Sequence, residues 1–174
     1  MNGKEVILVN EADEAIGKME KMEAHEKALL HRAFSVFIFN RKGEMLLQQR
    51  ADNKYHSAGL WTNACCSHPS PGEDTADAAA RRLKEELGFS APLEEVFTFM
   101  YRSDFENGLT ENEYDHVYSG IYEGRINPDK EEVKDFMYKP LDEINSSIKN
   151  EPGKYTSWFI IAFPRIRQWI ENQS

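Results

Sequence analysis

The segment EDTADAAARRLKEELGF, residues 73–89, contains the clearest helix in the sequence. Asp74 or Thr75 can cap its first turn, and Gly88 can end it, because glycine easily adopts the left-handed conformation found at many helix ends. Alanine or leucine recurs at helical spacing, at positions 76, 79, 80, 83 and 87. This apolar side predicts a helix over residues 75–87 that packs against a sheet.

Segments rich in β-branched and aromatic residues lie on both sides of this helix. They predict strands or extended segments over residues 6–9, 33–39, 45–49, 61–67, 96–102, 113–123 and 133–138. Two helices are expected near the end of the chain, at 141–149 and 156–172, the second bent or broken at Pro164. This order predicts a single domain over residues 1–174, an α+β or α/β sandwich with a mixed sheet.

The charge of the chain limits its partners. The 174 residues carry a formal net charge of −9, which disfavours nucleic acid or an acidic membrane surface as the main partner. No apolar stretch is long enough to span a bilayer, and the run 6–9 is too short for a signal-peptide core, so a cytoplasmic protein is expected. If such an acidic protein binds an anion, it needs a local basic cluster or a metal ion.

The two cysteines of the sequence, Cys65 and Cys66, are adjacent. Neighbouring residues do not easily meet disulfide geometry, so a structural disulfide is not expected. The simplest interpretation is two small buried side chains. The alternative is that Cys66 takes part in chemistry, since it lies in the polar segment WTNACCSHP, residues 61–69.

Two groups of residues could hold divalent cations. Glu85 and Glu86 end the predicted helix, and paired carboxylates suit a hard cation, although a solvated helix face would explain them equally well. Glu111 and Glu113 lie two residues apart and would share one face of a strand. With three histidines they could form an octahedral metal site, although a lone histidine is more often packed or on the surface. These histidines are His25, His31 and His68.

The spacing Glu73, Arg81, Glu85, Glu86 and Gly88 resembles the Nudix box, a loop–helix–loop whose glutamates hold Mg²⁺ against a diphosphate. The match has two departures, because Ser67 stands where the box begins with glycine and Arg82 stands where it has a glutamate. Replacing a carboxylate by a guanidinium removes a metal ligand and adds a cation suited to phosphate oxygens. The expectation is a fold that binds a diphosphate but does not hydrolyse it.

Strings along nearly the whole chain resemble the type I isopentenyl-diphosphate isomerases of the Nudix superfamily. They are EKMEAH (20–25), LHRAFSVFIFN (30–40), QQRADNK (48–54), WTNACCSHP (61–69), RRLKEELG (81–88), YRS (101–103) and ENEYDHV (111–117). The resemblance implies a Nudix-type α/β/α sandwich with a mixed β-sheet. It also implies the interconversion of isopentenyl and dimethylallyl diphosphate through a tertiary carbocation, a small-molecule reaction that calls for two acid/base groups flanking a dry pocket.

The resemblance assigns roles to individual residues of this sequence. Cys66 and Glu113 would be the acid/base pair, with Tyr101 relaying a proton to Glu113. Substrate-binding residues would be Lys21, Arg50, Lys54, Arg82 and, as an aromatic wall for the cation, Trp158. A diphosphate-bound Mg²⁺ would be held by Glu86 and the Cys66 carbonyl. A second divalent metal (Mn²⁺, Mg²⁺ or Zn²⁺) would be held by His25, His31, His68, Glu111 and Glu113.

Two other functions remain open from the sequence. One is a Nudix pyrophosphohydrolase, against which Ser67 and Arg82 argue. The other is a non-catalytic metal-binding module that kept the fold. Trp61 fits either core packing or the cavity wall, and neither His56 nor Cys65 receives a role.

Overall fold

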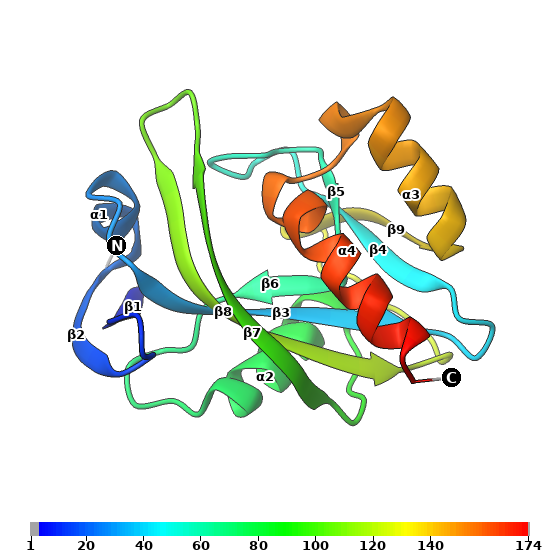
Figure 1. Cartoon of the computed structure of the whole chain (residues 1–174), viewed down its shortest axis with the longest axis horizontal. Coiled ribbons are helices and arrows are strands. Elements are labelled where there is room, and N and C mark those ends of the chain that lie inside the picture. The colour runs from blue at the N-terminus through cyan, green and yellow to red at the C-terminus, as the bar shows by residue number, and fades with distance from the viewer. Residues whose placement is uncertain (1–3, 174) are drawn as a thin grey trace.

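The computed structural model describes residues 4–173 (Figure 1). The predicted domain range 1–174 also includes residues 1–3 and Ser174, which lie outside the described residues. The strands are β1 (Glu5–Val9), β2 (Ala15–Glu20), β3 (His31–Phe39), β4 (Met45–Arg50), β5 (Trp61–Thr62), β6 (Cys65–Ser67), β7 (Glu94–Asp104), β8 (Thr110–Ile121) and β9 (Val133–Lys139). The helices are α1 (Lys21–Glu26), α2 (Thr75–Leu87), α3 (Leu141–Asn150) and α4 (Ser157–Glu171), with a 3-10 turn η1 (Pro152–Lys154).

Strand β3 organises the sheet, because four other strands pair with it. It runs parallel to β8 along its whole length, from His31 opposite Glu113 to Phe39 opposite Ile121. Strands β1, β6 and β4 follow one another along β3 as antiparallel partners. Strand β2 pairs with β1, β7 with β8, and β5 and β9 with β4. Within residues 4–173 these nine strands form one mixed sheet.

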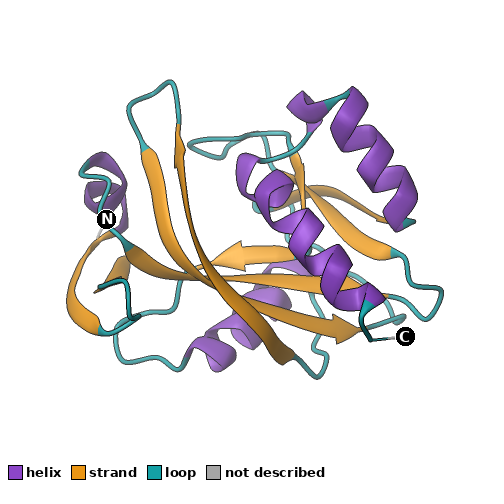
Figure 2. Cartoon of the chain, viewed as in Figure 1, coloured by secondary structure: helices purple, strands orange, loops and turns teal. Residues whose placement is uncertain are grey.

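The core lies on both faces of β3, and this explains why its run AFSVFIF is unbroken by polar side chains except Ser35. Phe34 and Val36 pack against the apolar side of α2. Phe37 and Phe39 point to the other face and pack with residues of α4. Helices therefore cover the sheet on both sides (Figure 2). The predicted α/β/α sandwich with a mixed sheet is confirmed.

Helix α2 has the predicted bounds, Thr75–Leu87. Asp74 is its N-cap and accepts a hydrogen bond from the Asp77 backbone N–H at 3.1 Å. Gly88 ends the helix at φ 76°, a value that would strain most other residues. Ala78, Ala79, Leu83 and Leu87 are buried on the sheet side. The predicted apolar stripe is therefore right at positions 79, 83 and 87, but wrong at Ala76 and Ala80, which are exposed.

Some local expectations need correction. Of the two outcomes predicted at Pro164, a bend or a break, the break is wrong, because helix α4 continues from Ser157 to Glu171. The buried Phe163 and Ile166 beside the proline anchor it in the core. The extended segment 61–67 is two short strands, β5 and β6, which pair with β4 and β3 respectively. The predictions also missed β2 and α1, because β2 is mostly exposed and α1 has only six residues.

None of the helices in the described part of the chain is long and apolar enough to cross a membrane.

Candidate active site

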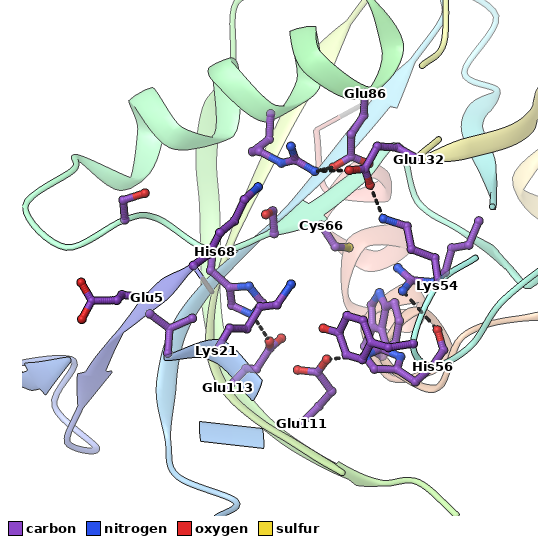
Figure 3. A pocket seen from close by; sticks show the side chains of 18 of the residues that line it. Glu5, Lys21, Lys54, His56, Cys66, His68, Glu86, Glu111, Glu113 and Glu132 are labelled. Carbon is purple, nitrogen blue, oxygen red and sulfur yellow. Dashed lines mark hydrogen bonds and ion pairs between the residues drawn. The ribbon is translucent and has the colours of Figure 1, made fainter. Parts of the chain in front are cut away.

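A cavity of about 380 Å³ opens between β4, β6, β8 and the N-terminal end of the chain. Figure 3 shows Cys66 near its middle, with Glu86, Glu132 and Lys54 on one side and His68, Glu111 and Glu113 on the other. The cavity therefore has two charged ends with the Cys66 thiol between them. Every catalytic and substrate-binding residue that the sequence predicted lines it: Lys21, Arg50, Lys54, Cys66, Arg82, Tyr101, Glu113 and Trp158.

The predicted histidine and glutamate residues form one cluster at the first end. Each residue contributes a ligand atom, and all these atoms lie within 4.8 Å of one another: His25, His31, His68, Glu111 and Glu113. The sheet explains how distant residues meet. Parallel pairing places His31 opposite Glu113. Glu111, two residues before Glu113, lies on the same side of β8. His68 comes directly after β6, which pairs with β3. Helix α1, which the sequence analysis missed, supplies His25.

The cluster has the chemistry of a metal site. The Lys21 and Leu29 carbonyls lie 2.6 and 2.9 Å from Nδ1 of His25 and His31 and accept hydrogen bonds there, which leaves Nε2 of each ring to face the cluster. Among the described residues, buried Glu111 Oε2 has no hydrogen-bond partner, and His25 Nε2 has only an ion-pair contact with Glu111 Oε1 at 3.1 Å; poorly paired buried polar atoms are costly. Burial and the neighbouring His31 lower the pKa of His68 well below its usual value. The residues thus fit a divalent cation, which would pair these atoms.

Glu113 is the most heavily bonded carboxylate of the cluster. Its Oε2 lies 2.7 Å from His68 Nε2 and 3.2 Å from His31 Nε2, and its Oε1 accepts a hydrogen bond from the Tyr101 hydroxyl. Burial alone would raise its pKa, but these hydrogen bonds, led by that from His31, hold the pKa of Glu113 at about 2. Glu113 is therefore ionised at neutral pH.

Cys66 is held in the opposite protonation state. Its Sγ lies 3.0 Å from Asn63 Oδ1 and 3.6 Å from Ser35 Oγ, both suitable acceptors for the thiol proton. Burial and the nearby Asp115 carboxyl raise the pKa of Cys66 to about 12, so the thiol keeps its proton. Cys65 points to the other face of β6, into the core under α2. Both cysteines are free, as the adjacent pair predicted.

The basic side chains that an acidic protein needs to bind an anion line the same cavity, and Figure 3 shows Lys54 on the side of Glu86 and Lys21 beside His68 and Glu113. Lys21, Arg50, Lys54 and Arg82 come from α1, β4, the following loop and α2, and they face the same cavity. Burial and the nearby Lys4 lower the pKa of Lys21. A bound anion would favour the charged form of this side chain. A local positive surface therefore exists in a chain whose net charge is −9.

The carboxylates of the Nudix-like segment are divided between two tasks. Glu73 binds Arg81 through both carboxylate oxygens, and Glu85 pairs with Arg81 and Arg82 on the surface. Neither lines the cavity, whereas Glu86 does. Its Oε1 accepts from Gln48 Nε2 at 3.0 Å and its Oε2 from Arg82 at 2.9 Å. Glu86 is thus the one carboxylate of that segment placed to hold a cation in the cavity.

The two tryptophans near the cavity differ. Trp158, at the start of α4, is 4% exposed and lines the cavity, with the Arg50 guanidinium 5.2 Å from the centre of its ring. Trp61 packs against the core formed with α4 and does not line the cavity. Of the two uses left open for Trp61, core packing is what the structure shows.

Sequence reasoning missed several residues of the site. Glu132 pairs with Lys54 and approaches Arg82 at 3.5 Å, and His56 lies 2.8 Å from Glu111. Asn63 and Gln48 contact Cys66 and Glu86. Asp115, which lies near Cys66, was also missed. The period of β8 could have indicated it, since a residue two positions after Glu113 lies on the same side of the strand. Gln48 lies on β4, and its contact with Glu86 depends on how that strand packs against α2; Glu132, His56 and Asn63 depend on loop conformation, which has no local sequence pattern.

Comparisons with known proteins give a consistent result. The family model described as the NUDIX domain matches residues 29–159. A protein of Pectobacterium atrosepticum named isopentenyl-diphosphate Delta-isomerase is 51% identical, over 93% of this chain and 90% of that protein. Isopentenyl-diphosphate Delta-isomerase 2 of Aromatoleum aromaticum is 45% identical, over 93% and 86%.

Solved structures support the fold alone, because their sequences are distant. A crystal structure of a Deinococcus radiodurans protein superposes with a TM-score of 0.78 at 17% identity, covering 93% of this chain and 98% of that one. A MutT protein of Methanosarcina mazei superposes with a TM-score of 0.66 at 20% identity, covering 83% and 96%.

Proposed function

Because this chain belongs to the NUDIX family and, within it, to the isopentenyl-diphosphate Delta-isomerases, we propose that it interconverts isopentenyl and dimethylallyl diphosphate. The observation that carries the proposal is the position of Cys66 in the cavity, with Lys54 and Glu86 on one side and Glu113 on the other (Figure 3). The substrate would enter with its diphosphate at one end and its alkene beside the thiol. The whole chain would act as one catalytic domain, since the cavity draws residues from Lys4 to Trp158.

The diphosphate would serve as a handle rather than as the reacting group. Lys21, Arg50, Lys54 and Arg82 would bind its oxygens, with Glu86 and the Cys66 carbonyl holding a Mg²⁺ against it. Lys54 and Arg82 now pair with Glu132 and would exchange this partner for phosphate. This binding fixes the alkene within reach of the acid/base groups, and orientation of this kind lowers the barrier of a proton transfer.

Cys66 and Glu113 would move the protons. One group must deliver a proton to C4 of the alkene, and a second must remove one from C2. In the free site the thiol is protonated and Glu113 is ionised, so the two groups start in complementary states. Tyr101 would steady the Glu113 carboxylate and relay its proton. When the reaction runs in reverse, the two groups exchange roles.

The tertiary cation at C3 needs an electron-rich neighbour that does not attack it. Trp158 would supply one, because the face of an indole attracts a cation without forming a bond. The histidine and glutamate cluster would hold a Mn²⁺, Mg²⁺ or Zn²⁺ ion, whose charge supplies an electrostatic bias at Glu113 when bound. A charged small-molecule substrate and two free cysteines both suit a reducing cytoplasm.

Hydrolysis of the diphosphate is the competing reaction for a NUDIX protein. Arg82 points its guanidinium at Glu85, Glu86 and Glu132, in the place where the box would supply another carboxylate. Glu73 and Glu85 do not line the cavity and pair with Arg81 and Arg82. Fewer carboxylates therefore remain for the metal ions that activate water. A non-catalytic module would not need a protonated thiol and an ionised carboxylate at opposite sides of one cavity.

The test is incubation with isopentenyl diphosphate and Mg²⁺ in deuterated water, followed by mass spectrometry and NMR of the products. The proposal requires deuterium in dimethylallyl diphosphate, and its loss with Cys66→Ala and with Glu113→Gln. Cys65→Ser is the matched control, because this neighbour points to the opposite face of β6 and serine keeps a donor toward Glu86 Oε2, and it should retain isomerisation. Release of phosphate without an allylic product would instead identify a hydrolase. Unchanged exchange in Cys66→Ala would remove the thiol from the mechanism.

A further inference from the structure

His56 lies at the edge of the active-site cavity without a part in the chemistry above. It belongs to the loop between β4 and β5, two residues after Lys54, and is only 7% exposed. Its ring stacks on Phe105, with centroids 4.4 Å apart and planes at 10°, and it meets the Trp158 ring edge-on at 5.6 Å. Burial between two aromatic rings holds the imidazole in one orientation.

The polar atoms of this ring are both engaged. Nε2 lies 2.8 Å from Glu111 Oε1, and Nδ1 lies 3.2 Å from Ser57 Oγ. The carboxylate oxygen accepts this hydrogen bond, so Nε2 carries the hydrogen, and Nδ1 lies within reach of the Ser57 hydroxyl. The backbone carbonyl of His56 accepts from Arg50, which ties the loop to one of the basic side chains of the cavity.

Glu111 needs such an anchor. Its side chain is 6% exposed, and its Oε2 has no hydrogen-bond partner. Oε1 lies 2.8 Å from His56 Nε2 and 3.1 Å from His25 Nε2, so His56 holds the carboxylate beside a ligand atom of the cluster and leaves Oε2 for a cation. Glu113 is held in the same manner by the Tyr101 hydroxyl at its Oε1. Each carboxylate of the cluster thus has one oxygen fixed by a donor outside the cluster, an arrangement that orients metal ligands.

We propose that His56 is a positioning residue that fixes the Glu111 carboxylate beside the histidine and glutamate cluster, as a ligand of the metal that this cluster would hold. His56 is not itself a member of the group of ligand atoms within 4.8 Å. Its Nε2 is occupied by Glu111, so it acts on the metal through this carboxylate. The inference rests on the proposed function only for the identity of the substrate, because metal binding can be measured without turnover.

Two substitutions separate the hydrogen bond from the ring. His56→Gln keeps an N–H donor of similar reach but removes the ring, whereas His56→Phe keeps the stacking on Phe105 and removes the donor. Each purified variant is stripped of metal and titrated with Mn²⁺ by calorimetry, without diphosphate. A Glu86→Gln variant treated in parallel identifies any Mn²⁺ bound at the other end of the cavity.

We expect His56→Phe to weaken Mn²⁺ binding by about 10- to 100-fold, the usual cost of losing such an outer partner, and His56→Gln to stay within about threefold of the parent. Equal affinity of His56→Phe and the parent overturns the proposal, and so does an equal loss in both variants, which would assign the effect to ring packing. If His56→Phe does not fold, His56→Gln decides alone by retaining or losing affinity. An isomerase assay of the unmodified protein, run alongside, reports separately on the proposed reaction.

Discussion

Removal of Arg82 tests whether this residue also stabilises the folded protein by neutralising the carboxylates beside the cavity. Its side chain is 11% exposed and contacts Glu85 at 2.7 Å, Glu86 at 2.9 Å and Glu132 at 3.5 Å. Arg82→Met keeps the unbranched stem and the helix propensity but removes the charge. Glu86, 7% exposed, then loses its cation while Glu132 remains nearby.

The size of the effect follows from burial. Removing one partner of a buried ion pair costs about 3–5 kcal/mol, because the other charge stays in the interior unpaired. For a chain of this length each kcal/mol lowers the melting temperature by about 2–4 °C, so we expect a decrease of roughly 6–20 °C. Arg81 provides the comparison, since its side chain is 37% exposed and pairs with Glu73 and Glu85 near the surface. Arg81→Met should cost only about 0–1 kcal/mol.

The assay is urea and thermal unfolding of both variants, free of metal and substrate, followed by circular dichroism. The prediction requires that Arg82→Met lower the free energy of unfolding and the melting temperature clearly more than Arg81→Met does. Equal losses would show that Arg82 is not needed to neutralise the cavity carboxylates, and its role would then be limited to binding substrate.

Two further predictions concern the same cavity. Because burial raises the pKa of Cys66 to about 12, its alkylation by iodoacetamide in metal-free protein should be slow at neutral pH. The alkylation rate, followed by mass spectrometry, should rise about tenfold per pH unit as the thiolate forms. A rate that levels off near the ordinary thiol pKa would contradict the raised pKa of Cys66. Gln48→Leu removes the donor to Glu86 Oε1 and to the Ala64 carbonyl, so it should raise the Mg²⁺ concentration needed for half-maximal activity. Gln49→Leu, whose amide bonds only Gly59 in the adjoining loop, is the control, and equal Mg²⁺ requirements in the two variants would exclude the role of Gln48.

Local pattern was sufficient for the elements with strong periodicity or capping. Helix α2 has its predicted bounds, because Asp74, the alanine stripe and Gly88 each act within a few residues. The apolar run of β3 likewise indicated a buried strand. The short helix α1 and the exposed strand β2 lack such patterns, and tertiary contacts stabilise them instead. Pro164 does not break α4, because buried neighbours on both sides hold the helix in the core.

By itself the sequence determined the family, the residue types of the site and the two changes in the box, since these depend only on which side chains follow one another. Only the tertiary structure decided how they meet. The parallel register of β3 and β8 places His31 opposite Glu113, and pairing between segments so far apart has no local signature. The same holds for the loop that brings His56 to Glu111 and for the return of Glu132 to Lys54. Helix α2 orients Glu86 into the cavity and leaves Glu85 outside, because successive helical residues point in different directions around the axis.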